Sequence, residues 1–265
     1  MNGALRAAWA YRQFIIRSIY NEFRLRVIRS RLGGAWIILQ PLALVLMYAL
    51  VLSTVIAGKL PGIDSRFAYA IYLTAGIVAW SLFLEVTNRC VGLFVERAEL
   101  IKKLRFPRIT LPLIVLGVAT LNNLLLMAVV VIVFAILGHL AGVAMLWLPL
   151  IMLLTALFAA GLGLSLGVLN VFIRDIGQLM PIVTQFLFLA TPIIYPVHIV
   201  PEPIRSLLVL NPLYHLVGAY HDILVYSQAP HVSVGLLVVM LLTGVLLFLA
   251  LQLFRRGGPH MVDVL

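Results

Sequence analysis

Long apolar stretches separated by short polar ones dominate the pattern along this chain. The longest lies between Arg108 and Arg174, where 65 consecutive residues include no Asp, Glu, Lys or Arg. As one straight helix at ~1.5 Å per residue, this run would be ~100 Å long, about three times the ~30 Å hydrocarbon core of a bilayer. It must therefore fold back on itself, and Gly138, His139 and Gly142 mark the expected turn.

The apolar stretches predict an all-α integral membrane protein with six transmembrane helices. They lack the alternation of strands, and in lipid only helices or a closed barrel satisfy every backbone hydrogen-bonding group. The expected spans cover residues 34–57, 68–94, 110–137, 144–172, 177–196 and 232–254.

The segment before the first span predicts an amphipathic helix over residues 4–31. Apolar side chains recur there at spacings of three, four and seven positions, beside a polar stripe. The apolar stripe comprises Leu5, Trp9, Ile16, Tyr20, Phe23 and Val27, and the polar stripe comprises Arg6, Gln13, Arg17, Arg24 and Arg31. Such a helix lies on a membrane surface, either as a basic anchor on anionic lipid or as a docking surface for a cytoplasmic partner.

Two connections between spans differ from simple short loops. The segment from Glu96 to Arg108 is strongly charged, and it predicts a short cytoplasmic helix that Pro107 stops. The segment from Pro196 to Pro230 is too apolar for a free loop and too interrupted for a span. There we expect two short re-entrant helices that dip into the outer leaflet.

Composition and charge agree with the prediction of an integral membrane protein. Of the 265 residues 63% are hydrophobic and 11% are charged, whereas about a quarter of the residues of a soluble domain are charged. With a cytoplasmic amino terminus, sixteen of the nineteen basic residues lie on the cytoplasmic side, and Lys59, Arg66 and Arg205 lie outside. The positive-inside rule therefore predicts two cytoplasmic termini and explains the net charge of +10 without nucleic acid as a partner.

Motifs of enzymes are missing from the sequence. It has no G-x-x-x-x-G-K-[ST] phosphate loop, no H-E-x-x-H, no cysteine pair, and no close pair of acidic residues suited to Mg²⁺ and a sugar nucleotide. This argues against a membrane-bound glycosyltransferase or phosphatase, and we expect no metal site. An ion-coupled secondary transporter would have inverted repeats and several intramembrane carboxylates, but Glu85 is the only clear one here.

Charged and aromatic side chains in the second expected span allow two interpretations. Glu85 and Arg89 are spaced i, i+4 on one helical face, where they form a structural ion pair or line a hydrated path. The same span carries aromatic rings at Tyr69, Tyr72, Trp80 and Phe83. These rings either pack in the core or offer flat apolar faces to sugar rings.

Small and polar side chains predict contacts between the helices. Gly163 and Gly167 are spaced as a close-packing face of the fourth expected span. Polar groups expected to face other helices are Asn122, Asn123, Asn170, Gln178 and Gln185.

Short motifs follow one another in order over nearly the whole chain. They are Arg31-Leu32-Gly33 with Trp36, Leu39-Gln40-Pro41, Ala75-Gly76 with Trp80 and Phe83, Leu100-Ile101-Lys102-Lys103, Phe106-Pro107, Leu111-Pro112, Arg174-Asp175, Thr191-Pro192-Ile193-Ile194-Tyr195-Pro196, and Asn211-Pro212. In order and spacing the chain resembles the membrane subunit of ABC-2-type polysaccharide exporters, the group of O-antigen, capsule and teichoic acid permeases. His221-Asp222 departs from the pattern, since many relatives have an Arg after the Asn-Pro motif.

The resemblance implies a permease that forms a homodimer and binds two copies of a cytoplasmic ABC ATPase. ATP and Mg²⁺ would bind to that ATPase, and no cofactor is expected on this chain. The substrate would be a lipid-linked polysaccharide, foremost O-antigen, which crosses the bacterial inner membrane from the cytoplasm. Capsular polysaccharide, teichoic acid or a small molecule are the alternatives within the class.

The resemblance also divides the chain and assigns roles to residues. Residues 1–32 would form the interface helix and residues 33–265 the six-span domain, with a coupling helix at about 95–108 and outer gate helices at about 197–230. The residues expected to couple to the ATPase are Glu96, Glu99, Leu100, Ile101, Lys102, Lys103, Phe106 and Pro107. Those expected along the translocation path are Tyr48, Tyr72, Trp80, Glu85 and Arg89. Those expected at the outer gate are Tyr195, Pro196, Asn211, Pro212 and Tyr214.

Overall fold

The computed structural model describes residues 9–28, 67–103, 107–139 and 142–264, with a few single positions between 35 and 47. Helices are the only regular secondary structure in this part of the chain. The first expected span, 34–57, lies almost entirely outside the described residues, and so do Tyr48 and Phe106.

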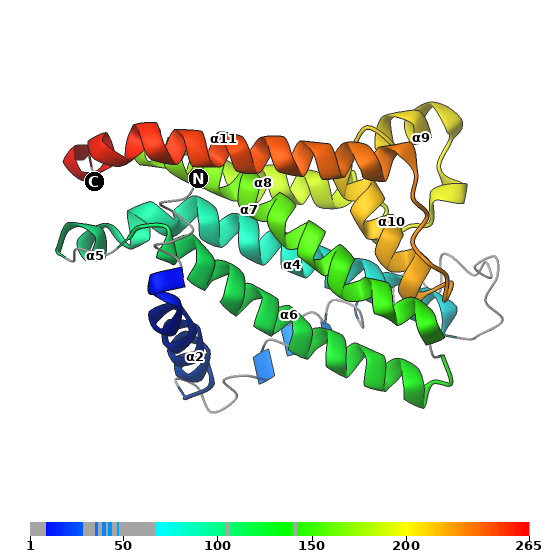
Figure 1. The fold of residues 1–265 in the computed structure, drawn as a ribbon. Helices are drawn as coiled ribbons and strands as arrows, with labels where there is room; N and C mark the ends of the chain where they lie inside the picture. The colour runs from blue at the N-terminus through cyan, green and yellow to red at the C-terminus, as the bar shows by residue number, and fades with distance from the viewer. Residues whose placement is uncertain are drawn as a thin grey trace.

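Four helices in the described ranges are long and apolar enough to cross a membrane, and they lie side by side in one bundle (Figure 1). They are α4 (Ala68–Glu96), α6 (Thr110–Ile136), α7 (Leu148–Phe172), which the 3-10 helix η2 (Gly142–Trp147) precedes, and α11 (Val234–Val264). These helices correspond to the second, third, fourth and sixth expected spans. Gly138 and Gly142 have φ angles of +74° and +50°, which glycine adopts without strain, and the predicted turn between α6 and α7 is confirmed.

The fifth expected span is shorter than the hydropathy pattern predicts. α8 (Asp175–Leu189) has 15 residues, ~22 Å at 1.5 Å per residue, which is less than the ~30 Å hydrocarbon core. The chain then turns, because Pro192 and Pro196 cannot donate the backbone hydrogen bonds that a longer helix needs. The predicted end of this helix at residue 196 is therefore wrong.

Short helices follow α8 at the end of the bundle opposite α5 (Ala98–Lys103) (Figure 1). They are η3 (Val197–Ile199), α9 (Glu202–Leu208) and α10 (Pro212–Leu224). Two short α-helices, α9 and α10, are present between residues 196 and 230 as predicted, and their position in the outer leaflet stays a prediction. α10 packs against α4, so this segment is part of the bundle and not a free loop.

α4 lies at the centre of the core and contacts α6, α7, α8 and α10. Its closest contact is with α7. A Cβ atom added at Gly167 would lie 2.3 Å from the backbone oxygen of Cys90, and one added at Gly163 would lie 2.8 Å from the Cβ of Cys90. The predicted close-packing face is confirmed, because only glycine at these positions lets the two backbones approach so closely.

Buried amides also hold α6 and α7 against α4, as the sequence predicts for Asn123 and Asn170, whereas Gln178 and Gln185 are exposed on α8 and the prediction for them is wrong. Asn123 of α6 donates from Nδ2 to the backbone oxygen of Val78, at 3.0 Å. Asn170 of α7 donates from Nδ2 to the backbone oxygen of Val91, at 3.1 Å. Both amides are buried, where a polar group without a partner would be costly.

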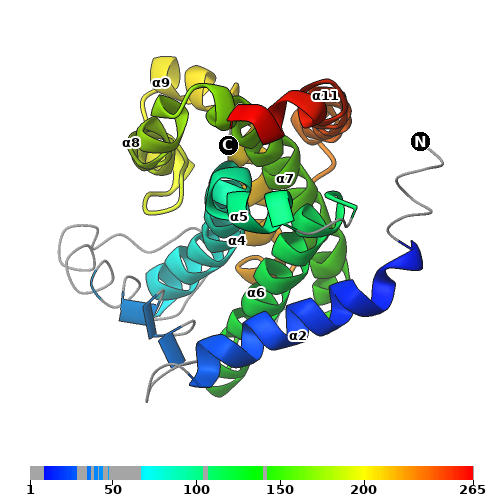
Figure 2. The ribbon, with the colours of Figure 1, turned by 90° about the vertical axis from the view of Figure 1, so that its left-hand side faces the viewer.

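α2 (Arg12–Ile28) lies outside the bundle and crosses α6 (Figures 1 and 2). The helix predicted over residues 4–31 is present within these bounds, but its contact face differs from the predicted apolar stripe. Half-buried Ile15 and Ile19 face the protein, and Ile19 lies so close to α6 that a Cβ added at Gly117 would be 2.3 Å from its Cδ1. The stripe members Trp9, Ile16 and Tyr20 are 71%, 63% and 61% exposed. Large apolar side chains on the outer face suit a helix that contacts lipid.

Candidate functional site

α5 presents charged side chains at one end of the bundle, beside the carboxyl-terminal part of α11 (Figures 1 and 2). It follows α4 directly, after the cap residue Arg97. Ile101 is buried in the core and half-buried Leu100 packs against it, so one apolar side fixes the helix to the bundle. Glu99 and Lys102 on the other side are exposed. This arrangement leaves charged side chains exposed at this end of the bundle.

Only some of the predicted coupling residues lie in α5. The helix covers Ala98–Lys103, a shorter range than the predicted 95–108. Glu96 lies at the end of α4 and is exposed, and Pro107 is half-buried before α6. The side chain of Lys103 and all of Phe106 lie outside the described residues.

A network of charges connects α2, α4 and α6 close to this end. Arg89 forms ion pairs with Glu22 of α2 and, at 3.5 Å from Nη1 to Oε1, with Glu85. The other oxygen of Glu22, Oε2, lies 3.5 Å from Nη2 of Arg97. Asn122 of α6 donates from Nδ2 to Oε1 of Glu85, at 2.7 Å. The predicted pair of Glu85 and Arg89 is therefore confirmed, within a larger network.

Glu22 is the member of this network that sequence reasoning missed. It is the only acidic residue among the first 31, which include seven arginines. A single carboxylate on a basic helix was the available signal, but nothing in the sequence named its partners, because Arg89 is 67 positions away.

Hydrogen bonds join the turn after α8 to the first two turns of α4 at the opposite end of the bundle. The hydroxyl of Tyr72 donates to the backbone oxygens of Pro192 and Tyr195, at 3.1 and 3.2 Å. The Tyr69 hydroxyl donates to the backbone oxygen of Ile194, and the Tyr195 hydroxyl donates to the backbone oxygen of Leu189, at 2.9 Å. The motif from Thr191 to Pro196 is thus a turn that α4 holds.

His221, where the sequence departs from the expected motif, packs against α4. Its ring stacks on that of Tyr72 with 3.8 Å between centroids, and its Nε2–H donates to the Tyr72 backbone oxygen at 3.1 Å. His221 belongs to α10, which is not one of the spanning helices. Burial lowers the pKa of His221 to about 3, so its ring is neutral. The next residue, Asp222, accepts from the backbone N–H of His231, at 2.9 Å. These two residues fasten α10 and the following loop.

Asn211 and Pro212 begin α10 and tie it to the same turn. The side-chain oxygen of Asn211 accepts from the backbone N–H of Leu213, at 3.0 Å, as an N-cap does. Its Nδ2 donates to the backbone oxygen of Ala190 at 3.1 Å and to Thr191 Oγ1 at 2.9 Å. Pro212 occupies the first turn, where its missing N–H costs nothing.

The structure brings the predicted gate residues together only in part. Tyr195 lies in the turn after α8, Asn211 contacts this turn, and Pro196 caps η3. The ring of Tyr214 instead packs against His215, with 5.1 Å between centroids.

Replacing Asn211 with alanine should lower the free energy of unfolding by about 2 to 4 kcal/mol. The variant loses the N-cap, worth about 1 kcal/mol, and two further hydrogen bonds, worth about 0.5 to 1.5 kcal/mol each. The measurement is thermal unfolding in detergent. Asn211→Ser keeps a capping oxygen but loses the amide donor, so its midpoint should fall between those of Ala and wild type. An alanine variant as stable as wild type would contradict this role.

Two of the predicted path residues are buried within the described chain. Tyr72 contacts the turn after α8, and Trp80 packs its ring 5.4 Å from Phe83 and 5.3 Å from Phe188. In this conformation both side chains are buried within the bundle. Their place along a path stays a prediction that requires movement of α8, whereas Glu85 and Arg89 are partly exposed.

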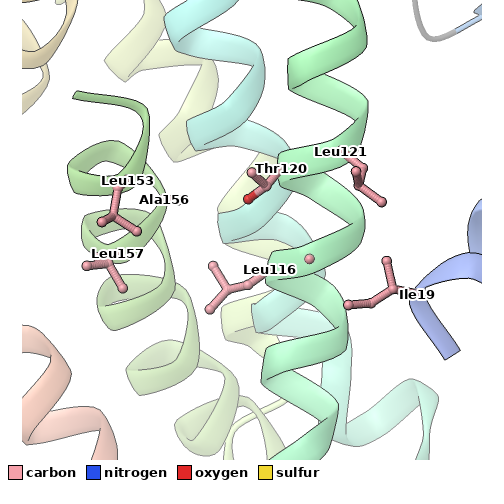
Figure 3. A pocket seen from close by; sticks show the side chains of 8 residues that line it. Ile19, Leu116, Thr120, Leu121, Leu153, Ala156 and Leu157 are labelled. Carbon is pink, nitrogen blue, oxygen red and sulfur yellow. The ribbon is translucent and has the colours of Figure 1, made fainter. Parts of the chain in front are cut away.

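A cavity of about 440 Å³ lies between α2, α6 and α7 (Figure 3). It is lined by Ile19, Leu116, Gly117, Thr120, Leu121, Leu153, Ala156 and Leu157. No lining residue is ionisable, and Thr120 is the only one with a polar side chain. Among the residues described, no group of three or more His, Cys, Asp or Glu side chains is placed to hold a metal ion.

Four apolar spanning helices, an outlying basic helix and a charged helix at one end define a multi-pass membrane protein. The family model described as ABC-2 type transporter matches residues 15–225, from α2 to the end of α10. The chain belongs to this family, whose members are the membrane subunits of transporters, with ATPase activity in a separate subunit.

Similar proteins cover almost the whole chain. The O-antigen export system permease protein RfbA of Klebsiella pneumoniae is 24% identical over 247 residues, 92% of each chain. The protein of the same name from Myxococcus xanthus is 26% identical over 261 residues, 98% of each chain. The polysialic acid transport protein KpsM of Escherichia coli is 25% identical over 247 residues, 91% of this chain and 92% of its own.

Proposed function

We propose that this chain is the permease subunit of an ATP-driven exporter that moves lipid-linked polysaccharide, specifically O-antigen, out of the cytoplasm. It would act in the bacterial inner membrane as a homodimer bound to a pair of ABC ATPase subunits, with both termini in the cytoplasm. The observation that carries the proposal is the similarity to polysaccharide export permeases over 91% to 98% of this chain.

The arrangement of the helices supports a mechanism. α4 has 29 residues, ~43 Å at 1.5 Å per residue. One end leads into α5, and the other holds the turn after α8 through Tyr72. A movement of α5 during ATP hydrolysis would therefore be transmitted to the turn after α8 through one continuous helix. In this proposal the exposed charges of α5 contact the ATPase, and the segment from Tyr195 to Tyr214 opens the outer gate.

The path itself would bind each sugar weakly. A polymer that moves through a channel in many steps must leave every site as easily as it enters. We assign Glu85 and Arg89 to this path, together with Tyr48, Tyr72 and Trp80 once α8 has moved. Their polar and aromatic groups match the hydroxyls and flat faces of sugars.

Export of capsular polysaccharide is a second candidate, and a specific observation favours it. The polysialic acid transport protein matches at 25% identity, within the 24% to 26% range of the O-antigen permeases. Identity therefore does not separate the two substrates.

Deletion of the gene in its own bacterium tests the proposed function. O-antigen should disappear from the cell surface, and lipid-linked polymer should accumulate inside, with both restored by a plasmid copy. An ATPase partner with its catalytic glutamate replaced should give the same result, which an ion-coupled transporter would not. Loss of capsule with normal O-antigen would support the second candidate, and no change in either polymer would contradict both.

A further inference from the structure

Glu22 is positioned to hold two points of α4 at once. One of its oxygens pairs with Arg89 inside the span, and the other lies 3.5 Å from Arg97, directly before α5. These arginines are eight residues apart, ~12 Å along a helix. A single carboxylate of α2 thus connects the end of the membrane span to Arg97, which forms the elbow between α4 and α5.

Partial burial makes this connection stronger than an ordinary surface ion pair. The side chains of Glu22 and Arg89 are 23% and 19% exposed, whereas that of Arg97 is 46% exposed. Exposed ion pairs contribute little because water screens them, and sheltered ones are screened less. The ion pair of Glu22 with Arg89 is therefore the stronger of the two, and the ion pair with Arg97 is the one nearer to α5.

The other contacts of α2 do not fix its position as strictly. Ile19 lies against Gly117 of α6, and a cavity adjoins this contact (Figure 3). Apolar contacts are non-directional, so a helix held by them alone can slide or rotate on its neighbour. A carboxylate between two guanidinium groups sets both the distance and the rotation of α2.

We propose that Glu22 is a positioning residue that clamps α2 to the elbow between α4 and α5, so that α2 moves with the elbow when the ATPase acts on α5. This inference rests on the proposed function, because that function makes the ATPase the source of the force on α5. Without the clamp, the elbow would move while α2 stays behind, and ATP hydrolysis would continue with less polymer exported.

The Glu85 carboxylate makes the test feasible. When Glu22 is replaced, Arg89 keeps its pairing with Glu85 at 3.5 Å, so the cation is not left alone in the span. Glu22→Gln keeps the size of the side chain and removes its charge. Glu22→Asp keeps the charge on a shorter side chain. Arg24→Gln, at an exposed position of the same helix, is the matched control for loss of one charge.

Two measurements on the full chain with its ATPase test the clamp. The first is polymer exported per ATP hydrolysed in proteoliposomes. The second is the rate of disulfide formation between Ile19→Cys and Gly117→Cys, which reports the position of α2 whatever the polymer is. The native Cys90 is fully buried and should not interfere.

Glu22→Gln should lower export per ATP at least fivefold and slow crosslinking at least threefold. Glu22→Asp should recover at least half of both values, and Arg24→Gln should match wild type. Arg97→Gln should lower export per ATP in the same direction, and the double variant of Glu22 and Arg97 should be no worse than Glu22→Gln alone.

Three results would overturn the inference: wild-type crosslinking in Glu22→Gln, slower crosslinking with unchanged export per ATP, or effects of Glu22 and Arg97 that multiply. The proposed function fails separately, when the wild-type complex exports no polysaccharide. The crosslinking rates remain interpretable in that case, because they require no substrate.

Discussion

Replacing Gly167 with alanine should prevent α4 and α7 from packing and strongly reduce the yield of folded protein. The added Cβ would lie 2.3 Å from the backbone oxygen of Cys90 and 3.3 Å from the Cα of Val91. The obstacle is backbone in the middle of a helix, so no side-chain rotation relieves it. We expect a loss of about 3 kcal/mol, at the upper end of the usual cost of overpacking.

The yield in detergent and the thermal unfolding midpoint measure this effect. Gly244→Ala is the matched control, because nothing lies within 4 Å of a Cβ at that position in α11. Alanine is favoured over glycine in a helix by about 1 kcal/mol, so the control should be as stable as wild type or more stable. A Gly167→Ala protein with the wild-type midpoint would show that α4 and α7 do not approach in this way.

Reversing the charge of Lys102 and Lys103 together should abolish export while the protein still inserts and folds. Lys102 is exposed on α5, and the buried Ile101 that holds this helix on the bundle is untouched. If α5 contacts the ATPase, two glutamates there change the local charge by four units and oppose the partner surface. Surface polysaccharide should fall at least tenfold, and ATP hydrolysis should no longer drive export.

The matched control reverses Arg255 and Arg256, two exposed cations at the same end of the bundle in α11. The change in charge is identical, but it lies outside α5. Surface polysaccharide should stay within twofold of wild type. An equal loss in the control would assign the effect to net charge on this side of the membrane, and normal export from the lysine variant would refute the coupling role.

The sequence by itself determined those features that depend on short stretches of chain. Hydropathy located the four spanning helices that the structure describes, because the transfer of apolar side chains into lipid depends mainly on local composition. Spacing paired Glu85 with Arg89, since residues four apart share a helical face. The positions of Gly163 and Gly167 indicated where a neighbouring helix approaches, because small side chains expose the backbone.

Only the tertiary structure decided features that depend on distant partners. The turn after α8 is apolar enough to continue a span, and its hydrogen bonds to Tyr72 come from a helix about 120 positions earlier. Periodicity pointed to the stripe of α2 with Trp9, Ile16 and Tyr20, whereas contact with α6 selected the face that includes Ile19. The partners of Glu22 became visible only when folding brought α2 beside α4. Local sequence fixes which segments enter lipid, whereas the contacts between those segments depend on packing geometry that no single segment encodes.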